Sequence, residues 1–149
     1  MVYQPVDGGG KGGGVALDLS FEMLKRAKEK HASANITYVQ AAAEQLPFKP
    51  GKFNRVICFA CFPHFDNKPV AVTEIARTLT QDGILVIAHA ASRGKINVMH
   101  TSIGGVLSQD VIPTNAEMHY LLEQSGFSKI HISDETDFYL VLAEKEMNN

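Results

Sequence analysis

Short apolar runs alternate with segments of helical period along most of the chain. Four of these runs predict strands that are joined through helices, at residues 15–17, 36–39, 56–59 and 84–88. Two more runs, 127–132 and 138–143, are separated by the charged segment 134–137 and predict a terminal antiparallel pair. The alternation is typical of parallel strands connected by crossover helices, so we expect an α/β fold.

Polar residues mark the expected helix boundaries. Ser20 is a candidate N-cap for a helix that continues to about His31. Asp66 or Asn67 is expected to cap the next helix, which should stop at residues 81–83. Two further helices are expected, one from Ile96 to Ile103 and one around residues 118–122.

Composition narrows the class of protein. With 149 residues and 45% hydrophobic content, the chain is expected to form one folded domain. Its net charge is −2 and its longest basic run is Lys25-Arg26, so a nucleic-acid partner is not expected. No apolar stretch reaches the roughly 18 residues of a membrane span, and no secretion signal is visible. We therefore expect a cytoplasmic protein with no membrane partner, whose Cys58 and Cys61 are reduced thiols.

Asp18 is the most informative single residue. It ends the first of the joined strands, directly before the predicted helix, where a carboxylate is well placed to bind the two hydroxyls of a ribose. The alternative is that Asp18 only caps that helix, since aspartate also serves at helix N-termini.

Three segments resemble the class I S-adenosylmethionine-dependent methyltransferases, in particular the branch related to the ubiquinone and menaquinone methylases. Residues 17–24, LDLSFEML, resemble the strand whose acid binds ribose in that family. Residues 41–48, AAAEQLPF, resemble the segment that lines the adenine ring, and residues 74–87 resemble the helix and fifth strand. The resemblance implies a three-layer Rossmann-like sheet, mostly parallel with an antiparallel C-terminal strand. It also implies S-adenosyl-L-methionine as cofactor and a small-molecule methyl acceptor.

The resemblance carries a set of expected cofactor contacts with it. They are Gly8, Gly10, Gly12, Asp18, Leu19, Ala43, Glu44 and Phe59. Glycines at residues 8, 10 and 12 would let the backbone approach the methionine part of the cofactor. The alternative for this glycine run is a linker or a deletion, because no helix follows it and a parallel crossover normally needs about 10 residues or more.

Two departures from the family pattern have consequences. Ala42 stands where the family usually carries an acid that binds the adenine amino group, and Glu44 or a backbone amide is the expected substitute. The first strand-loop-helix unit is truncated or replaced, so we expect an irregular segment 1–14, with at most a poor strand at residues 2–7, before a single domain 15–149. An absent helix would leave an apolar sheet face uncovered, which predicts a homo-oligomer, with another segment that fills the vacancy as the alternative.

Candidate catalytic residues follow the strands whose carboxyl ends should form the site. His64 and His89 are the expected bases, because histidine titrates near neutral pH. Phe62, Arg93 and His100 are expected to contact the acceptor, with Phe59, Phe62 and Phe65 as apolar walls and Arg93 facing a substrate carboxylate. These residues have alternative roles. For His64 and His100 the alternative is a surface or packed histidine, Phe59 and Phe62 are equally expected in the core, and Arg93 has the role of a solvated cation as its alternative.

Three functions remain open from the sequence. The first is methyl transfer to a small molecule, impaired if the cofactor loop is truncated. The second is a catalytically degenerate relative that keeps the fold for binding or scaffolding. The third is a metal-binding module built on Cys58, Cys61, His64 and His89, although the spacing matches none of the usual zinc sites and no metal is expected.

Overall fold

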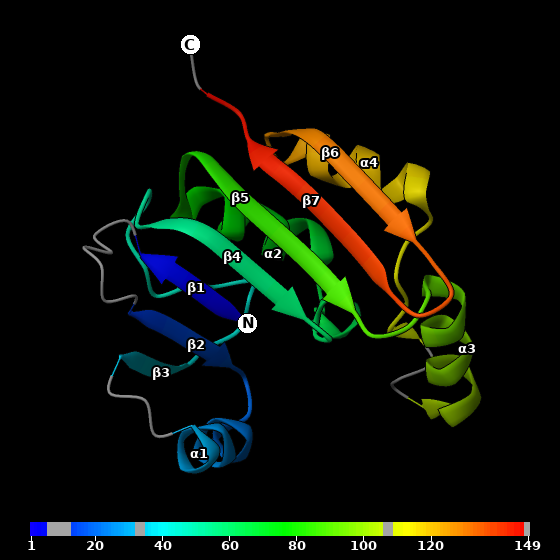
Figure 1. The fold of residues 1–149 in the computed structure, drawn as a ribbon, viewed down its shortest axis with the longest axis horizontal. Coiled ribbons are helices and arrows are strands. Elements are labelled where there is room, and N and C mark those ends of the chain that lie inside the picture. The colour runs from blue at the N-terminus through cyan, green and yellow to red at the C-terminus, as the bar shows by residue number, and fades with distance from the viewer. Residues whose placement is uncertain (6–12, 32–34, 106–108, 148–149) are drawn as a thin grey trace.

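The computed structural model describes residues 1–5, 13–31, 35–105 and 109–147, which form one seven-stranded sheet with helices packed against it (Figure 1). The strands are β1 (Val2–Pro5), β2 (Gly14–Asp18), β3 (Ile36–Gln40), β4 (Phe53–Phe59), β5 (Leu79–His89), β6 (Phe127–Asp134) and β7 (Tyr139–Lys145). The helices are α1 (Phe21–Lys30), α2 (Lys68–Thr78), α3 (Arg93–Ile103) and α4 (Asn115–Gln124), with a 3-10 turn η1 (Phe62–His64). The strand order is β3-β2-β1-β4-β5-β7-β6, so the expected α/β fold is confirmed.

The directions of the strands agree with the sequence except at the centre. β2 pairs with β3 and β4 pairs with β5 in parallel, while β7 is antiparallel to both β5 and β6. The expected antiparallel ending is therefore confirmed. No helix formed by the described residues is long and apolar enough to cross a membrane.

β1 is a strand at the centre of the sheet, and it runs opposite to both of its neighbours. Val2 pairs with Ala16 of β2 and with Ile57 of β4, whereas Pro5 pairs with Phe53 at the other end. Eight residues separate β1 from β2. A parallel return would need a longer crossover, whereas an antiparallel partner can be reached by a short connection. Residues 2–5 are thus a regular part of the sheet instead of irregular chain, and the domain boundary at residue 14 stays a prediction.

The two faces of the sheet are covered differently. α2 and α4 lie behind the sheet in Figure 1, and Val56, Leu85 and Val141 on that face are fully buried. On the opposite face Phe59 is 62% exposed and Leu142 is 36% exposed. Within the described residues, no helix lies over this face of β4, β5 and β7 (Figure 1). The uncovered sheet face expected from the sequence is confirmed for this part of the chain.

Side-chain caps explain where the helices begin. The Ser20 hydroxyl accepts a hydrogen bond from the Met23 amide at 3.3 Å, which confirms Ser20 as the N-cap of α1. Asn67 caps α2 by accepting from the Val70 amide at 3.1 Å, so the alternative cap, Asp66, is wrong. Each cap satisfies one of the amides that a first helical turn leaves without a partner.

α2 ends at Thr78, before the predicted stop at residues 81–83. Leu79 already belongs to β5, where it is fully buried and pairs with Phe53. The ladder then shifts register before Ile84, and Asp82 takes a left-handed φ of 59°. Burial of Leu79 in the sheet therefore outweighs the helical period of the sequence.

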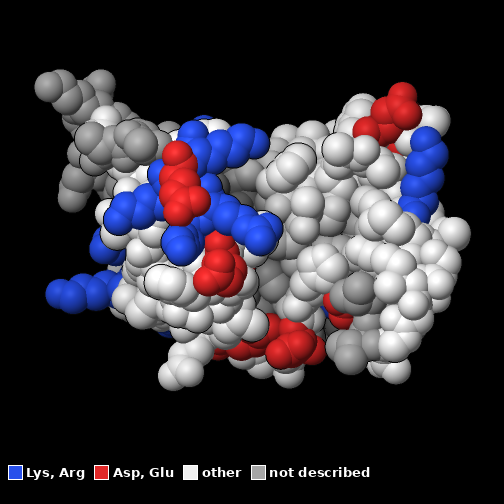
Figure 2. Space-filling view, turned by 90° about the horizontal axis from the view of Figure 1, so that it is seen from below, with Lys and Arg blue, Asp and Glu red and all other residues white. Residues whose placement is uncertain are grey.

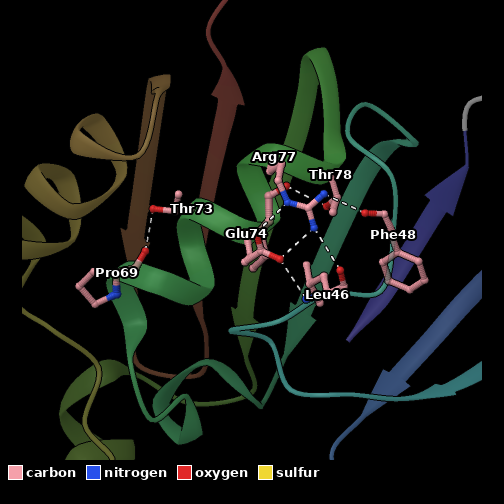
Figure 3. A network of polar contacts seen from close by, with 8 residues as sticks. Leu46, Phe48, Pro69, Thr73, Glu74, Arg77 and Thr78 are labelled. Carbon is pink, nitrogen blue, oxygen red and sulfur yellow. Dashed lines mark hydrogen bonds and ion pairs between the residues drawn. The ribbon is translucent and has the colours of Figure 1, made fainter.

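An ion pair on α2 holds the segment that follows β3. Arg77 binds both carboxylate oxygens of Glu74, at 2.7 and 2.9 Å (Figure 3). The same guanidinium donates to the carbonyls of Phe48 at 2.8 Å and Leu46 at 3.1 Å, and Glu74 accepts from the Leu46 amide at 3.0 Å. These hydrogen bonds from Arg77 and Leu46 lower the pKa of Glu74 and keep its carboxylate charged. Residues 46–48 are thereby fixed against α2.

We predict that Arg77→Met destabilises the fold. Methionine keeps much of the packing but leaves the Glu74 carboxylate and two carbonyls without their partner, so the free energy of unfolding in urea should fall by about 1–3 kcal/mol. Lys28→Met, an exposed change on α1, is the matched control and should stay within about 0.5 kcal/mol of wild type. Equal stabilities for Arg77→Met and the control would contradict this role of the ion pair.

Candidate functional site

A pocket of about 350 Å³ opens at the carboxyl ends of β2 and β4. Its walls come from the end of β2 and start of α1 (residues 17–19 and 23), from the segment after β3 (41–44), from the segment after β4 (60, 61 and 64–66) and from Met1. This is the edge at which open α/β sheets bind ligands. Four stretches of chain that are separate in sequence thus contribute to one concave site.

Asp18 lies in this pocket and also fixes the turn into α1. Its Oδ1 accepts a hydrogen bond from the Ser20 amide at 2.8 Å, while Ser20 caps the helix. A carboxylate has two oxygens that each accept more than one hydrogen bond, so this local contact leaves capacity for a ligand hydroxyl. The two roles considered for Asp18 are therefore compatible. Leu19 beside it also lines the pocket and is 66% exposed.

The segment after β3 supplies the opposite wall. Ala42, Ala43 and Glu44 all line the pocket, and Ala43 is buried. Glu44 accepts a hydrogen bond from the Asn67 amide through Oε1 at 3.1 Å, which joins this wall to the start of α2. Residues 46–48 continue this wall, and they are the part of the segment that Glu74 and Arg77 hold through hydrogen bonds.

His64 reaches the pocket from η1 and is paired with Asp110. Ala60, with a left-handed φ of 51°, turns the chain after β4 into η1. His64 Nδ1 lies 2.7 Å from Asp110 Oδ2. An ionised carboxylate only accepts hydrogen bonds, so Nδ1 carries the proton and Nε2 of the neutral ring is left as an acceptor. The sequence places Asp110 among the polar residues near the site, but nothing in its pattern pairs Asp110 with a histidine 46 positions away.

His100 completes this group. Its ring centroid lies 5.0 Å from that of His64, and its Nδ1 donates to the backbone carbonyl of Asp110. His100 is 6% exposed, so it packs beneath the pocket-lining histidine. The structure thus brings the predicted residues His64 and His100 together around Asp110.

His89 and Tyr139 form a second, buried polar pair nearby. His89 Nε2 and the Tyr139 hydroxyl are both buried without a hydrogen-bond partner among the described residues, and the two rings are 6.4 Å apart. Burial, with a smaller contribution from His100 and His64, lowers the pKa of His89 to about 4. Burial, and then the nearby Asp134, raises the pKa of Tyr139 to about 12. Both side chains are therefore neutral near pH 7 and have unused hydrogen-bonding capacity.

Three of the predicted site residues do not line the pocket. Phe62 is fully buried in the core, with its ring 5.4 Å from that of Phe65, and it does not line the pocket. Phe59 lies on the uncovered face because neighbouring strand residues point to opposite sides of a sheet. Arg93 donates its amide to Asp134 at 2.8 Å, and its Nε lies 3.6 Å from the same carboxylate. Arg93 thus has an ion-pair partner, but its buried Nε has no hydrogen-bond partner among the described residues, so substrate binding by Arg93 stays a prediction.

Gly8, Gly10 and Gly12 lie outside the described residues. The described residues on either side of them, Pro5 and Gly13, are at the amino ends of β4 and β2, across the sheet from the pocket. In the described part of the chain, Met1 occupies the pocket wall beside Leu17, to which it is joined by two backbone hydrogen bonds of 2.8 Å.

The two cysteines do not form a metal centre with the described histidines. Cys58 and Cys61 are free, and across the described ranges no group of three or more His, Cys, Asp or Glu side chains is arranged to hold a metal ion. The Cys61 thiol and burial raise the pKa of Cys58 well above its usual value, so Cys58 stays protonated. This geometry gives no support to the metal-binding alternative.

The surface around the site is divided by charge. Figure 2 shows Lys and Arg gathered over the half on which α1 lies, whereas the half on which α3 lies is mostly uncharged. α1 contributes Lys25, Arg26, Lys28 and Lys30. On α3 the apolar side chains Val98, Met99 and Ile103 are 67%, 51% and 61% exposed. The surface of α3 is therefore largely apolar.

Known proteins share this sequence pattern. Residues 10–87, just over half of the chain, match the profile of a family described as methyltransferase domain. The chain is 33% identical over 81 residues to the uncharacterized methyltransferase YcgJ of Bacillus subtilis. It is 37% identical over 81 residues to the ubiquinone/menaquinone biosynthesis C-methyltransferase UbiE of Wigglesworthia glossinidia brevipalpis. Each match covers 52% of the chain and 32% of the relative. The matched part of the chain therefore spans about a third of the length of each of these curated relatives.

Solved structures share the fold. The crystal structure of YcgJ from Bacillus subtilis superposes with a TM-score of 0.71 at 15% identity, covering 90% of the chain and 82% of YcgJ. Phosphoethanolamine N-methyltransferase 2 of Haemonchus contortus, solved with S-adenosylhomocysteine, gives 0.71 at 15% identity over 89% of the chain and 43% of that protein. The family match and the shared fold together show that the chain belongs to the S-adenosylmethionine-dependent methyltransferase family.

Proposed function

We propose that this chain transfers a methyl group from S-adenosylmethionine to a small-molecule acceptor. The observation that carries the proposal is one pocket that joins Asp18, at the end of β2, to the His64–Asp110 pair beyond β4. A carboxylate can bind the ribose of the cofactor, and an oriented imidazole can take a proton from an acceptor that carries one.

The described pocket fits the nucleoside part of the cofactor. Its volume of about 350 Å³ is within the range of small-molecule sites, and its walls are largely apolar around the carboxylates of Asp18, Glu44 and Asp66. Asp18 would bind the ribose hydroxyls, and Leu19, Ala42 and Ala43 would contact the adenine. When bound, the cofactor supplies an electrophilic methyl group on a sulfonium.

His64 would act as the base for an acceptor that carries an acidic O–H, N–H or C–H group. Its Nε2 is the free acceptor, because Nδ1 donates to Asp110. As the proton arrives, the Asp110 carboxylate stabilises the imidazolium and keeps the ring oriented. An acceptor without such a proton would need only alignment and desolvation from these residues.

His89, Tyr139 and the α3 surface would select the acceptor. His89 remains neutral near pH 7, so it serves as a hydrogen-bonding group better than as a base. The uncharged side chains of α3 favour an acceptor with an apolar body, as does the quinone-related name of the relative UbiE.

Ala42 favours a second function, a degenerate relative that binds without turnover. A methyl group cannot accept a hydrogen bond from the adenine amino group, and Glu44 uses Oε1 for the Asn67 amide. The missing contact would weaken cofactor binding by about 1–3 kcal/mol if the amino group is buried without a partner. Reduced affinity, and with it impaired turnover, is thus part of the proposal.

The cellular compartment and the oligomeric state of the protein are part of the same proposal. The free thiols of Cys58 in the core and Cys61 in the pocket fit a reducing compartment, so we place the reaction in the cytoplasm. The uncovered sheet face supports a homo-oligomer.

We predict that Asp18→Asn weakens binding of S-adenosylhomocysteine. Asparagine can still accept the Ser20 amide but loses the charge and one acceptor oxygen, so the dissociation constant measured by calorimetry should rise by roughly 10- to 100-fold. Ser20→Ala is the matched control, because it removes the helix cap and leaves the carboxylate in place. Equal binding by Asp18→Asn and wild type, or no binding by wild type at millimolar ligand, would rule out the ribose role.

We predict that His64→Gln slows methyl transfer far more than it weakens cofactor binding. With tritiated S-adenosylmethionine and 1,4-naphthohydroquinone as the probe acceptor, kcat should fall by roughly 10²–10⁴-fold, the range of general base catalysis. Asp110→Asn should show a smaller loss, and His119→Gln, on the exposed side of α4, should show none. If wild type transfers methyl groups and His64→Gln does so equally well, His64 is not the base.

We predict that His89 titrates near pH 4 in the folded protein, which NMR of the histidine ring signals can measure. Its folded pKa lies below the unfolded value of about 6.5, so the neutral form favours folding above pH 6.5 and this stability is lost as the pH falls toward 4. The loss should be at most about 3 kcal/mol, and His89→Gln should flatten this part of the stability profile. A measured pKa at or above 6.5 would contradict the buried, unpaired state of the ring.

A further inference from the structure

We propose that the uncovered face of β4, β5 and β7 is a symmetric dimer interface, in which this face packs on the same face of a second copy. The two-fold axis would run parallel to β5. The inference gives the proposed self-association a surface and a symmetry, and it does not depend on methyl transfer.

The face is built from three rows of side chains that cross the same three strands. The first row is Arg55, Ile84 and Glu144; the second is Ile57, Val86 and Leu142; the third is Phe59, Ala88 and Leu140. One row therefore has a cation at its β4 end and an anion at its β7 end. The other two rows are apolar throughout.

The order of residues in each row makes the face complementary to itself. A two-fold axis along β5 places β4 of one copy opposite β7 of the other and keeps each row opposite itself. Arg55 then faces Glu144 of the partner subunit, Ile57 faces the partner's Leu142, and Phe59 faces the partner's Leu140. Because of the symmetry, every such contact is made twice.

The charges on the face are arranged for such a partner. Arg55 is exposed and has no ion pair with another residue in the described ranges. Glu144 is paired with Lys129 through Oε1 at 2.6 Å, and a second cation can still approach its other oxygen. The mixed charges and apolar rows fit a copy of the same face better than a polyanion or a lipid headgroup.

The exposed apolar side chains supply the driving force. Phe59 and Leu142 are exposed in the isolated chain, and two sheets packed face to face at about 10 Å would bury both. A stable interface buries roughly 800 Å² on each partner, more than three short rows provide, so its margins on β6 would contribute. We therefore expect a dissociation constant in the micromolar range.

Charge reversal tests the proposed pairing. Arg55→Glu places two carboxylates opposite each other, and Glu144→Arg places two guanidinium groups opposite each other. Either change alone should raise the dimer dissociation constant measured by sedimentation by about tenfold or more. The double variant should restore it, and an equimolar mixture of the two single variants should form a heterodimer in native mass spectrometry, because both of its charge pairs are opposite in sign.

Two controls separate association from folding and from the site. Lys28→Glu on α1 should leave the dimer unchanged. Each variant should keep the circular dichroism spectrum and the S-adenosylhomocysteine affinity of wild type, so a failure of the interface is distinguishable from a failure of the methyltransferase proposal. Wild type that stays monomeric at high micromolar concentration, or a dimer unaffected by either single reversal, would overturn the inference.

Discussion

Backbone pairing along both edges of β1 holds the two halves of the sheet together. β2 and β3 form one half, β4, β5, β7 and β6 form the other, and β1 is the strand between them in the described sheet. The pocket draws Asp18 and Leu19 from the first half and Cys61 and His64 from the second. The geometry of the site therefore depends on a strand whose reversed direction is set by a short connection to β2. The family match begins at residue 10, so this strand lies outside it.

The two faces and the carboxyl edge of the sheet have different structural roles. The face under α2 and α4 carries the core, and the Glu74–Arg77 pair connects that core to residues 46–48, which continue the pocket wall of residues 41–44. The carboxyl edge carries the polar groups, some of them buried without partners, as is usual where chemistry takes place. The open face carries three rows of side chains in register. A helix over that face would cover the surface that we propose for self-association.

Local signals in the sequence predicted most elements and one half of the site. Ser20, the apolar strands and Asp18 before α1 depend on neighbours in the chain, and the structure has them where the pattern indicates. The direction of β1 was harder to predict, because a short segment beside glycines has no periodicity that indicates how the strand runs. The end of α2 was missed because Leu79 is helical in period but buried in the sheet. Asp110 and Tyr139 meet the histidines through long-range packing, so no spacing in the sequence reveals these contacts. Phe62 lies in the core, one of the two places expected for it, because aromatic residues near a strand end suit a core as well as a pocket.

The central claim is that the cofactor binds at the carboxyl edge of β2 and β4. Amide chemical shifts of the isotopically labelled protein, followed during titration with S-adenosylhomocysteine, test it directly. The account predicts the largest changes at Asp18, Leu19, residues 42–44 and Cys61. Changes confined to the amino edge, at Gly13 and Gly51, would contradict it, as would unchanged spectra at millimolar ligand.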